Sequence, residues 1–490
     1  MMKLLSVDVG TTCCKCQLFD ENGEILCYKS EEYGFLSVGK ENYIDLFAVW
    51  QKLQAMILSL EHKDIASICI SSLGESFVLL DENDNVLFNP MLYTDVRGEE
   101  EAKWVEQKVG NEKIFNITGV TAHSMYSMYK LLWIKKHYPE IFARAKKVML
   151  VCDYLGYLLT GERVIDYSLA SRTGAFDIRK LCFSIELLEE VGIPVELFST
   201  PFRAGHIVGK LKDGLIKELG LTTVPSLVLG SHDQVCASLG AGAINKGDAV
   251  DGMGTVECIT TLFDKPSSDI RMGIQGYPCV PYVVDGLYCT YILNYSCGST
   301  VNWFRKKIMH GYCGEEQDYF AYMESKMDDE PSGIYVLPYF GGASTPYQDL
   351  NAKGAILNLT TKTEDYQVYK AIMEGTAMEM RFNGETVKKY GIKINSLVAT
   401  GGGANSDSWL KIKSDVQNVQ IKTLRSSEGG LCGCAMIQAV AMGIAENYEQ
   451  AKKIFVVYDK HYLPSEKDSK KYDAHYSKYK KIYKTVRSFS

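Results

Sequence analysis

An acid and a turn of glycine and threonine stand at the end of the first apolar run, in the order Asp8-Val9-Gly10-Thr11-Thr12. A phosphate group needs backbone N–H donors, close approach of the main chain and hydroxyl groups, and glycine and threonine supply these together. Asp8 adds a carboxylate that can hold Mg²⁺ through water, since magnesium keeps several of its waters in proteins. The turn therefore predicts an ATP phosphate loop with a magnesium ligand, although the same residue types also form ordinary hairpin turns.

A second copy of this pattern begins at residue 249 and ends at residue 263. It also has an apolar strand, an acid, a turn of glycine and threonine and a second strand, with Gly252, Gly254 and Thr255 in the turn. An internal repeat of this kind indicates a duplicated domain. We expect the two turns to face each other across a cleft and to hold the phosphate tail of ATP between them.

Three consecutive glycines, Gly401, Gly402 and Gly403, follow another apolar run and precede Asn405 and a helical stretch at 408–417. A planar ring can lie against such a bare backbone, and the first N–H groups of the helix are available to polar ligand atoms. A tight strand-to-helix turn is the alternative, but it requires fewer glycines. We therefore assign these glycines and Asn405 to an adenosine site.

A further apolar run ends in Leu229-Gly230-Ser231-His232-Asp233. An acid at a strand end that opens into a cleft is a candidate general base. Asp233 would accept the proton of a substrate hydroxyl during transfer of the γ-phosphoryl group, and it would also contact Mg²⁺. Phosphoryl transfer needs mainly positioning and charge neutralisation, so one base, Mg²⁺ and backbone donors are a sufficient set. His232 is a competing base, although a histidine beside an acid more often forms hydrogen bonds or packs.

Strands that alternate with helices would position these residues, because each candidate follows an apolar run. Apolar patterns predict strands at 4–9, 14–19, 25–30, 67–71, 147–151, 226–229 and 396–399. Helical spacing predicts helices at 129–136, 139–147 and 364–390, with Pro139 in a first turn and Gly391 after a last one. The sequence therefore predicts an α/β fold.

The length of 490 residues, 46% of them hydrophobic, exceeds one ordinary core, because single domains usually stop growing at about 250 to 300 residues. Small residues and a turn at 241–247 precede the second copy of the repeat. We predict domains at 1–245 and 246–490. Since no long linker rich in proline, serine or charge separates them, we expect the halves to pack closely and to move about a hinge.

Charge and hydropathy favour a small-molecule partner. The net charge of −7 excludes the basic field of a nucleic-acid-binding protein. The lysine-rich stretch from residue 467 onward contains tyrosines at helical spacing, which favours a solvated helix over a nucleic-acid-binding arm. No apolar stretch approaches the ~18 residues of a membrane span, and the first apolar run is too short for a signal peptide. We expect a soluble, cytoplasmic protein that binds neither nucleic acid nor membrane.

The 15 cysteines raise the question of a metal site or disulfides. Most stand alone in apolar segments, where a reduced thiol behaves as a small hydrophobe. The spacing from Cys13 to Cys16 lies in an alternating, strand-like run and has no second pair of ligands. Ordinary packing is preferred over a structural zinc site.

Taken in order along the chain, these motifs resemble those of the FGGY carbohydrate kinases, and the similarity spans nearly the whole sequence. The series also includes Gly74-Glu75 before Val78-Leu79-Leu80-Asp81, Tyr93-Thr94-Asp95-Val96-Arg97, Asp153-Tyr154 with Leu159-Thr160-Gly161, the stretch 166–177, Gly298 to Trp303, Pro338-Tyr339 with Thr345-Pro346, Glu374-Gly375 and Glu428-Gly429-Gly430. Each piece is short, but the ordered set is highly specific.

The resemblance implies two ribonuclease-H-like domains of the actin-like ATPase type that flank a central cleft, with sugar held mainly by the first and nucleotide mainly by the second. It identifies Asp233 as the catalytic base and Glu75, Asp95 and Arg97 as sugar contacts. Carboxylates and a guanidinium suit that role, because a polyol presents many donors and acceptors that must be satisfied. It also implies a homodimer.

Nucleotide contacts at Gly298 and Asn302 follow from the same resemblance. Departures from the family bear on the sugar. Where this chain has Gly74-Glu75, xylulokinase-like members usually carry Met-His and glycerol kinase-like members carry Arg-Glu. We predict transfer of the γ-phosphoryl group of ATP, with Mg²⁺, to a ketose or polyol, with a pentulose such as xylulose as the first choice. The alternatives are a non-catalytic sugar sensor and an actin-like or Hsp70-like ATP-driven binding protein.

Overall fold

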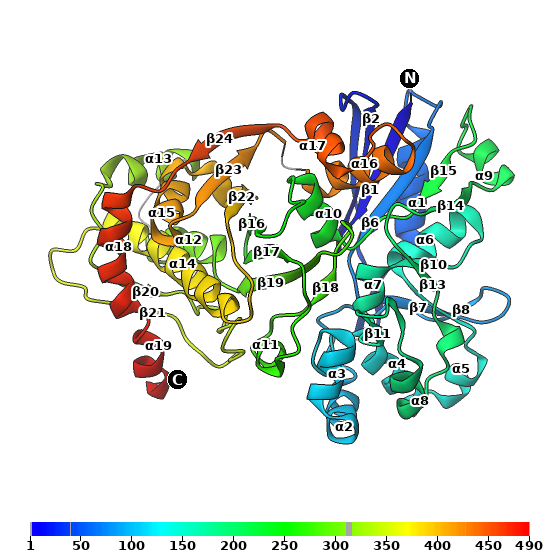
Figure 1. Cartoon of the computed structure of the whole chain (residues 1–490), viewed down its shortest axis with the longest axis horizontal. Helices are drawn as coiled ribbons and strands as arrows, with labels where there is room; N and C mark the ends of the chain where they lie inside the picture. Colours follow the sequence, from blue (N-terminus) through cyan, green and yellow to red (C-terminus); the bar gives the residue numbers. More distant parts are fainter. Residues whose placement is uncertain (1, 40, 310–315, 427, 490) are drawn as a thin grey trace.

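The computed structural model describes residues 2–39, 41–309, 316–426 and 428–489, and its two largest sheets share one strand order (Figure 1). The first sheet has the order β14 (Ile207–Lys210), β15 (Ser226–Val228), β6 (Ser67–Ser72), β1 (Lys3–Val9), β2 (Cys13–Asp20) and β3 (Ile25–Glu32). The second has the order β24 (Tyr458–Tyr462), β23 (Gln420–Leu424), β22 (Ser396–Thr400), β16 (Asp248–Met253), β17 (Glu257–Phe263), β19 (Tyr288–Asn294) and β18 (Val280–Pro281).

The two sheets also pair their strands in the same sense. The central strand, β1 or β16, pairs antiparallel with the hairpin strand that follows it and parallel with β6 or β22 on its other side. Next come a second parallel strand, β15 or β23, and an antiparallel edge strand, β14 or β24. The repeat seen in the sequence is therefore a repeat of topology.

Helices follow most of these strands. Those of the first half are α1 (Leu46–Leu58), α2 (Glu99–Val109), α3 (Asn111–Thr118), α4 (Ser127–His137), α5 (Pro139–Arg144), α6 (Val151–Thr160), α7 (Tyr167–Ser171), α8 (Ile185–Val191), α9 (Asp213–Glu218) and α10 (Asp233–Gly240). Those of the second half are α11 (Ile270–Ile274), α12 (Gly298–Trp303), α13 (Glu316–Lys326), α14 (Asp365–Lys388), α15 (Asp407–Gln417), α16 (Gly429–Ala441), α17 (Tyr448–Phe455), α18 (Glu466–Tyr479) and α19 (Ile482–Val486).

Short strands pair outside the two large sheets. They are β4 (Phe35–Val38) with β5 (Glu41–Ile44), β7 (Phe77–Leu80) with β8 (Val86–Phe88) and β9 (Lys147–Leu150), β10 (Val164–Asp166) with β13 (Thr200–Phe202), β11 (Phe176–Asp177) with β12 (Cys182–Phe183), and β20 (Tyr335–Leu337) with β21 (Ala355–Leu357).

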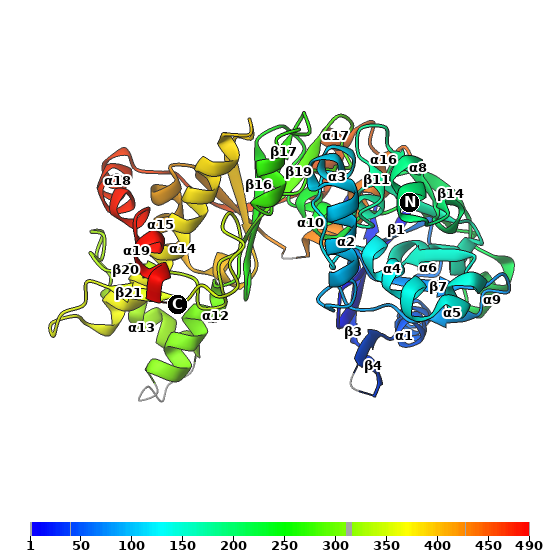
Figure 2. The same cartoon turned by 90° about the horizontal axis from the view of Figure 1, so that it is seen from below.

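Helices α10 and α16 lie between the two sheets, and their apolar side chains form one buried cluster with residues of both (Figures 1 and 2). The helices cross at glycines. A Cβ on Gly240 would lie 1.9 Å from the carbonyl oxygen of Gly429, and a Cβ on Gly433 would lie 2.0 Å from that of Cys236. Only glycine permits so close a crossing. The junction between the halves is therefore a tightly packed layer.

The predicted α/β fold is confirmed, and the predicted strands and helices are present with small differences at their ends. The strand expected at 147–151 is β9, and it ends at Leu150 because Val151 already begins α6. The helix expected at 139–147 ends at Arg144, because the backbone N–H of Lys146 donates to the carbonyl of Leu80, the last residue of β7. Among the described residues, no helix is both long and apolar enough to cross a membrane.

The tail rich in lysine and tyrosine forms α18, but one face of that helix is buried. The hydroxyls of Tyr472 and Tyr479 donate to Glu374 and Glu379 of α14, at 3.1 and 2.6 Å. These hydrogen bonds hold α18, near the end of the chain, against α14 of the second half. The expected solvated helix is thus solvated on one side only, because the tyrosines find buried carboxyl partners that the local sequence does not reveal.

The buried carboxyl group of Glu379 predicts a loss of stability with rising pH. Its side chain is 2% exposed, and burial raises its pKa to about 7. Because this value lies above that of an unfolded glutamate, the contribution of Glu379 to stability is fully present at acidic pH and is lost as pH rises through the folded pKa. The Glu379→Gln variant keeps the shape without the charge. We expect its apparent Tm to fall less than that of the wild type between about pH 5 and about pH 8 in thermal scans.

The control for this experiment is Glu385→Gln. Glu385 lies on the same helix and accepts a hydrogen bond from Tyr476 at 2.9 Å, but its side chain is 44% exposed. The Tm of the Glu385→Gln variant should fall with rising pH by as much as that of the wild type. Equal losses in all three proteins would contradict a special role for Glu379.

Candidate active site

Asp8 lies at the carboxyl end of β1, on the face of the first sheet that α16 covers. Side chains alternate along a strand, so Ser6 and Asp8 share a face. Ser6 accepts a hydrogen bond from Gln438 of α16 at 3.2 Å, and a Cβ on Gly430 would lie 3.2 Å from the Asp8 carboxyl group. Burial raises the pKa of Asp8, while a hydrogen bond from Ser71 on β6 acts in the opposite direction. The carboxyl group therefore faces the first turn of α16, where a negative charge is favoured.

The predicted phosphate turn joins β1 to β2 and is held from one side by Tyr33. The N–H of Gly10 donates to Cys13 at 2.9 Å, and the Tyr33 hydroxyl donates to the carbonyl of Gly10. The N–H of Tyr33 also donates to the carbonyl of Thr12 at 2.9 Å. Thr12 is exposed and Thr11 is half-buried, so the turn presents both threonines at a surface.

Asp233 begins α10 shortly after β15, at the same edge of the sheet as Asp8. A Cβ on Gly230 would lie 1.8 Å from the carbonyl oxygen of Ile70, so glycine is required where the chain passes β6. His232 then forms a parallel bridge with Ser72. Because β1, β6 and β15 are parallel, their carboxyl ends meet at one edge, where ligands of open α/β sheets bind.

The carboxyl group of Asp233 has an environment suited to a base. Its Oδ1 accepts a hydrogen bond from the N–H of Gln234 at 2.5 Å, and its side chain is 31% exposed. Burial raises the pKa of Asp233 to about 8, and the charges of Asp8 and Glu75 act in the same direction. Once ionised, a carboxylate with a raised pKa is a stronger base than an ordinary one. The three acidic side chains thus lie close enough to repel one another.

Glu75 follows β6 and is held by a buried guanidinium. Arg172 donates from Nε to Glu75 Oε1 at 2.6 Å, and both side chains are buried. A Cβ on Gly74 would lie 3.0 Å from the Arg172 side chain and 3.2 Å from that of His232. The Gly74-Glu75 pair that departs from the family pattern is therefore matched by its neighbours: Arg172 supplies the charge that Glu75 needs, and Arg172 and His232 fill the space beside Gly74.

Asp95 and Arg97 pair with each other. Arg97 donates from Nη2 to Asp95 at 2.6 Å, and from Nη1 to Glu41 at 2.6 Å and to the Tyr43 hydroxyl at 2.8 Å. Lys130 links this pair to the rest of the site, because its Nζ donates to the Asp95 carbonyl at 3.1 Å. Burial lowers the pKa of Lys130 to about 8, against the opposing influence of Asp95 and Glu75.

The predicted nucleotide contacts of the second half, except Gly401, line one cavity of about 800 Å³. A Cβ on Gly298 would lie 2.7 Å from the carbonyl oxygen of Gly254, and a Cβ on Gly403 would lie 2.9 Å from the Met253 side chain. These glycines therefore let three segments of the chain, at residues 253–255, 298–302 and 402–405, come together at one cavity. The predicted residues in this cavity are Gly254, Thr255, Gly298, Asn302, Gly402, Gly403 and Asn405, and apolar walls come from Val301, Phe320 and Trp409.

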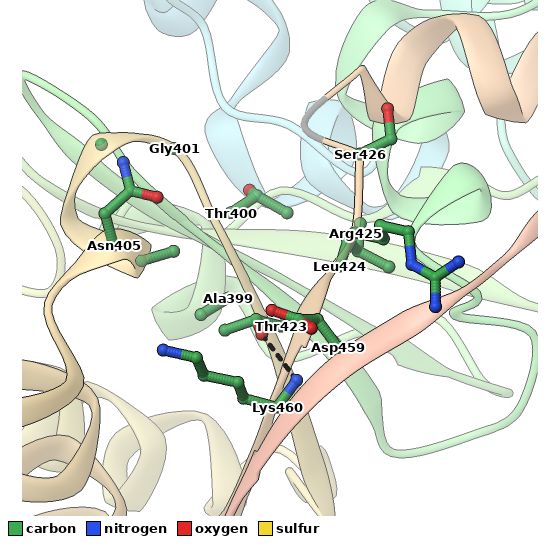
Figure 3. A pocket seen from close by; sticks show the side chains of 12 residues that line it. Ala399, Thr400, Gly401, Asn405, Thr423, Leu424, Arg425, Ser426, Asp459 and Lys460 are labelled. Atoms are coloured by element: carbon green, nitrogen blue, oxygen red, sulfur yellow. Dashed lines mark hydrogen bonds between the residues drawn. The ribbon is translucent and has the colours of Figure 1, made fainter.

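Gly401 lies in a neighbouring cavity of about 610 Å³ on the other side of the glycine run (Figure 3). Gly402 and Asn405 line both cavities. Figure 3 shows Gly401 and Asn405 on one side of this second cavity and Arg425 on the other. The glycine run is thus a thin wall between two cavities at the carboxyl ends of β22 and β23.

Residues 3–240 match the N-terminal domain of the FGGY family of carbohydrate kinases, and residues 253–442 match its C-terminal domain. The chain belongs to this family. It is 25% identical to a xylulose kinase of Lactococcus lactis over all of this chain and 98% of that one, and 26% identical to a gluconokinase of Bacillus subtilis over 96% and 93%. The structure of a xylulose kinase from Lactobacillus acidophilus has a TM-score of 0.90 at 25% identity, over the whole of both chains.

The expectation of a carbohydrate kinase, an enzyme that transfers a phosphoryl group from ATP to a sugar, is confirmed. The expectation of two actin-like domains is also confirmed, since solved kinase structures with this architecture superpose along the full chain. Because both halves match domains of carbohydrate kinases, the actin-like or Hsp70-like binding protein is rejected as an alternative. The domain limits at 245 and 246 fall between the two matched ranges and stay a prediction.

The second turn of this carbohydrate kinase differs from the first in the face of the strand from which its acidic side chain projects. Asp8 precedes Gly10 by two residues, whereas Asp251 precedes Gly254 by three, so the two acids point to opposite faces of their strands. Asp251 is fully buried and forms an ion pair with Lys413 of α15, which also pairs with Glu257. The acid of the second repeat is therefore structural, and this turn offers a ligand mainly backbone groups.

The predicted Mg²⁺ ligands, Asp8 and Asp233, present two carboxylates at one sheet edge. Among the described residues, no group of three or more His, Cys, Asp or Glu side chains is arranged to hold a metal ion. Magnesium usually binds through one or two carboxylates and completes its shell with phosphate oxygens and water. Burial, with a further contribution from the charge of Asp8, raises the pKa of Asp233, and a bound divalent cation would offset both effects.

Sequence reasoning missed four residues of this site: Lys15, Lys130, Arg172 and Tyr291. Lys15 is the register partner of Asp8 on β2 and pairs with Glu428, next to α16, at 3.0 Å. A lysine inside the apolar stretch of α4 was the available signal for Lys130. Arg172 lies within the stretch quoted for the resemblance, but only the fold brings it to Glu75.

Proposed function

We propose that this carbohydrate kinase uses Asp233 as the general base for phosphorylation of a ketose or polyol by ATP. The acceptor hydroxyl gives its proton to Asp233, and its oxygen bonds to the γ-phosphorus. The bond from that phosphorus to the β–γ bridging oxygen breaks, and ADP leaves with the electron pair. The observation that carries the proposal is the position of Asp233, beside Asp8 and Glu75 at the carboxyl ends of adjacent parallel strands.

The acceptor would lie in the first half against Glu75, Asp95 and Arg97. Carboxylates accept hydrogen bonds from sugar hydroxyls, and a guanidinium donates to hydroxyl or carbonyl oxygens. A pentulose such as xylulose is the first candidate, because two of the relatives compared above are xylulose kinases. A sugar acid is the second, because the buried Arg172 has an Nη1 atom without a hydrogen-bond partner among the described residues, and one relative is a gluconokinase.

The nucleotide would lie in the cavity of the second half, with adenosine against Gly402 and Gly403 and near Asn302 and Asn405. Its phosphates would lie between the turn at Gly254 and Thr255 and the turn at Gly10, Thr11 and Thr12. Movement of the halves about the layer of α10 and α16 would close the site and exclude water as an acceptor.

Mg²⁺ would be held by Asp8 and Asp233 together with phosphate oxygens and water, and when bound it neutralises negative charge on the transferred group. Lys15 lies near Asp8 and supplies a fixed positive charge to the same region. Ser71 orients the Asp8 carboxyl group through its hydrogen bond.

Replacing Asp8 with asparagine should raise the Mg²⁺ concentration needed for half-maximal activity by about tenfold or more, since a contact to a charged group is worth about 1.5–3 kcal/mol. A titration of initial rate against Mg²⁺ measures this. Asp64→Asn is the control, because Asp64 is exposed and pairs with Lys3 at the start of the same strand. An unchanged Mg²⁺ titration for Asp8→Asn would reject Asp8 as a metal ligand.

A coupled assay of ADP release over pentuloses, hexuloses, polyols and sugar acids tests the proposed function. We expect sugar-dependent release with the pentulose class, and preference for sugar acids would select the second candidate. Release with no member of the panel would favour the non-catalytic sugar sensor. The homodimer and the cytoplasmic location stay predictions.

A further inference from the structure

His232 lies between the proposed base and a tyrosine of the other sheet. Its Nε2 atom is 3.2 Å from Asp233 Oδ1, and its Nδ1 atom is 3.2 Å from the hydroxyl of Tyr291. Both rings are buried, with 6% of each residue exposed. Tyr291 belongs to β19 of the second sheet, whereas His232 directly precedes α10. The contact therefore joins the two halves of the molecule at the proposed base.

The partners of the imidazole define its tautomer. The His232 ring is buried, and a neutral imidazole has one donor and one acceptor nitrogen. An ionised Asp233 can only accept, so Nε2–H must donate to it. Nδ1 must then accept from the Tyr291 hydroxyl, which in turn accepts from the Cys289 thiol at 3.9 Å. Every donor in this chain points toward Asp233.

The position of His232 is fixed by hydrogen bonds of its backbone and by the close fit of its ring beside Gly74. Its backbone N–H donates to Ser168 Oγ at 3.0 Å, and that hydroxyl lies 2.6 Å from Ser231 Oγ. Asp166 accepts from Ser231 at 3.0 Å and from the N–H groups that begin α7. Gly74 leaves just enough space for the ring edge. These contacts hold His232 with its Nε2 atom next to Asp233.

We propose that His232, held as the Nε2–H tautomer by Tyr291 of the second sheet, is a positioning residue that fixes the carboxylate of Asp233 for proton abstraction. This inference rests on the proposed function. It also couples the base to the relative position of the halves, because the hydroxyl that sets the tautomer is carried by the sheet that holds the nucleotide cavity.

Tyr291→Phe is the most direct test, because it removes one hydroxyl and leaves the ring in place. We expect kcat to fall by about tenfold, as for loss of one hydrogen bond worth about 1.4 kcal/mol, with KM for sugar and ATP changed less than about twofold. Tyr288→Phe is the matched control: it lies on the same strand, and its hydroxyl donates to Ile178 at 3.0 Å, away from Asp233. Its kcat should stay that of the wild type.

Two substitutions of His232 separate positioning from packing. His232→Leu fills the space without a donor and should lose about 100-fold in kcat, whereas His232→Gln keeps an N–H near the Nε2 position and should recover at least about tenfold of that loss. Nitrogen-15 NMR of the folded enzyme should report a neutral Nε2–H tautomer in the wild type and a mixture of tautomers in Tyr291→Phe.

The outcomes distinguish this inference from the proposed function. If Asp233→Asn is inactive but Tyr291→Phe and His232→Leu keep kcat within about twofold, the positioning role is wrong and the base assignment stands. If His232→Leu loses activity but Tyr291→Phe changes neither kcat nor tautomer, the role of Tyr291 is wrong and the inference fails as stated. Turnover retained by Asp233→Asn would overturn the base and the positioning role together.

Discussion

Asp233→Asn is expected to lower kcat for sugar phosphorylation by about 1,000-fold, within the range that general-base catalysis contributes. Asparagine has nearly the same shape, so it keeps the acceptor oxygen for the N–H of Gln234 that lies 2.5 Å from Oδ1. It cannot take a proton from the acceptor hydroxyl. Since the proposed nucleotide contacts lie in the second half, ATP affinity measured by calorimetry should change little.

The control for this variant is Asp213→Asn. Asp213 begins α9 as Asp233 begins α10, so both changes remove a negative charge from the first turn of a helix in the same half. Asp213→Asn should therefore show any cost of losing a helix-terminal charge without loss of turnover. Wild-type rates in Asp233→Asn would reject the base assignment, and equal losses in the two variants would mean that the effect is one of folding.

The sequence predicted the parts of this molecule that depend on neighbours along the chain. Apolar runs located β1, β2, β6, β15 and β22, because a strand or a buried helix face imposes its period on consecutive residues. The glycine turns were found in the same way. Gly230 and Gly401 are required by close approach of other backbone atoms, and Gly403 lies against the Met253 side chain. In the sequence, these needs are visible as glycines at the ends of apolar runs.

Side-chain pairs formed across the fold could not be predicted. Glu75 and Arg172 are 97 positions apart, and His232 and Tyr291 are 59 apart. No local period links such residues, since their contact depends on strand order and on the packing of helices between the sheets. The buried tyrosines of α18 were missed for the same reason: helical spacing shows that they share a face, but not that carboxyl groups of α14 lie opposite.

The face of the strand on which Asp251 lies could have been predicted from the sequence. Counting from the turn glycine, the acid is two residues away in the first copy and three in the second, and side chains of a strand change face at every residue. The odd spacing predicts that Asp251 faces away from the ligand side. Its pairing with Lys413 still depends on the fold, because Lys413 lies on α15, far along the chain.

Gly402→Val is expected to raise KM for ATP by about tenfold or more while leaving KM for the sugar unchanged, a loss of about 1.4 kcal/mol of nucleotide binding. A Cβ on Gly402 would meet no protein atom within 4 Å, and the residue lines both cavities beside the glycine run. The valine methyl groups would therefore occupy space that the proposal gives to adenosine. Gly401 is unsuitable, because its φ of 81° and its closeness to Met253 require glycine for the fold.

Gly209→Val is the matched control, since Gly209 on the edge strand β14 also has open space at its Cβ position and lies far from the glycine run in the topology. Steady-state kinetics with each substrate varied in turn separates the outcomes. A rise in KM for ATP in Gly402→Val alone supports the adenosine site, because only that side chain enters the cavity. If both variants keep the wild-type KM for ATP, the nucleotide does not lie against the glycine run. Its contacts would then be those at Gly254 and Gly298, which line the same cavity.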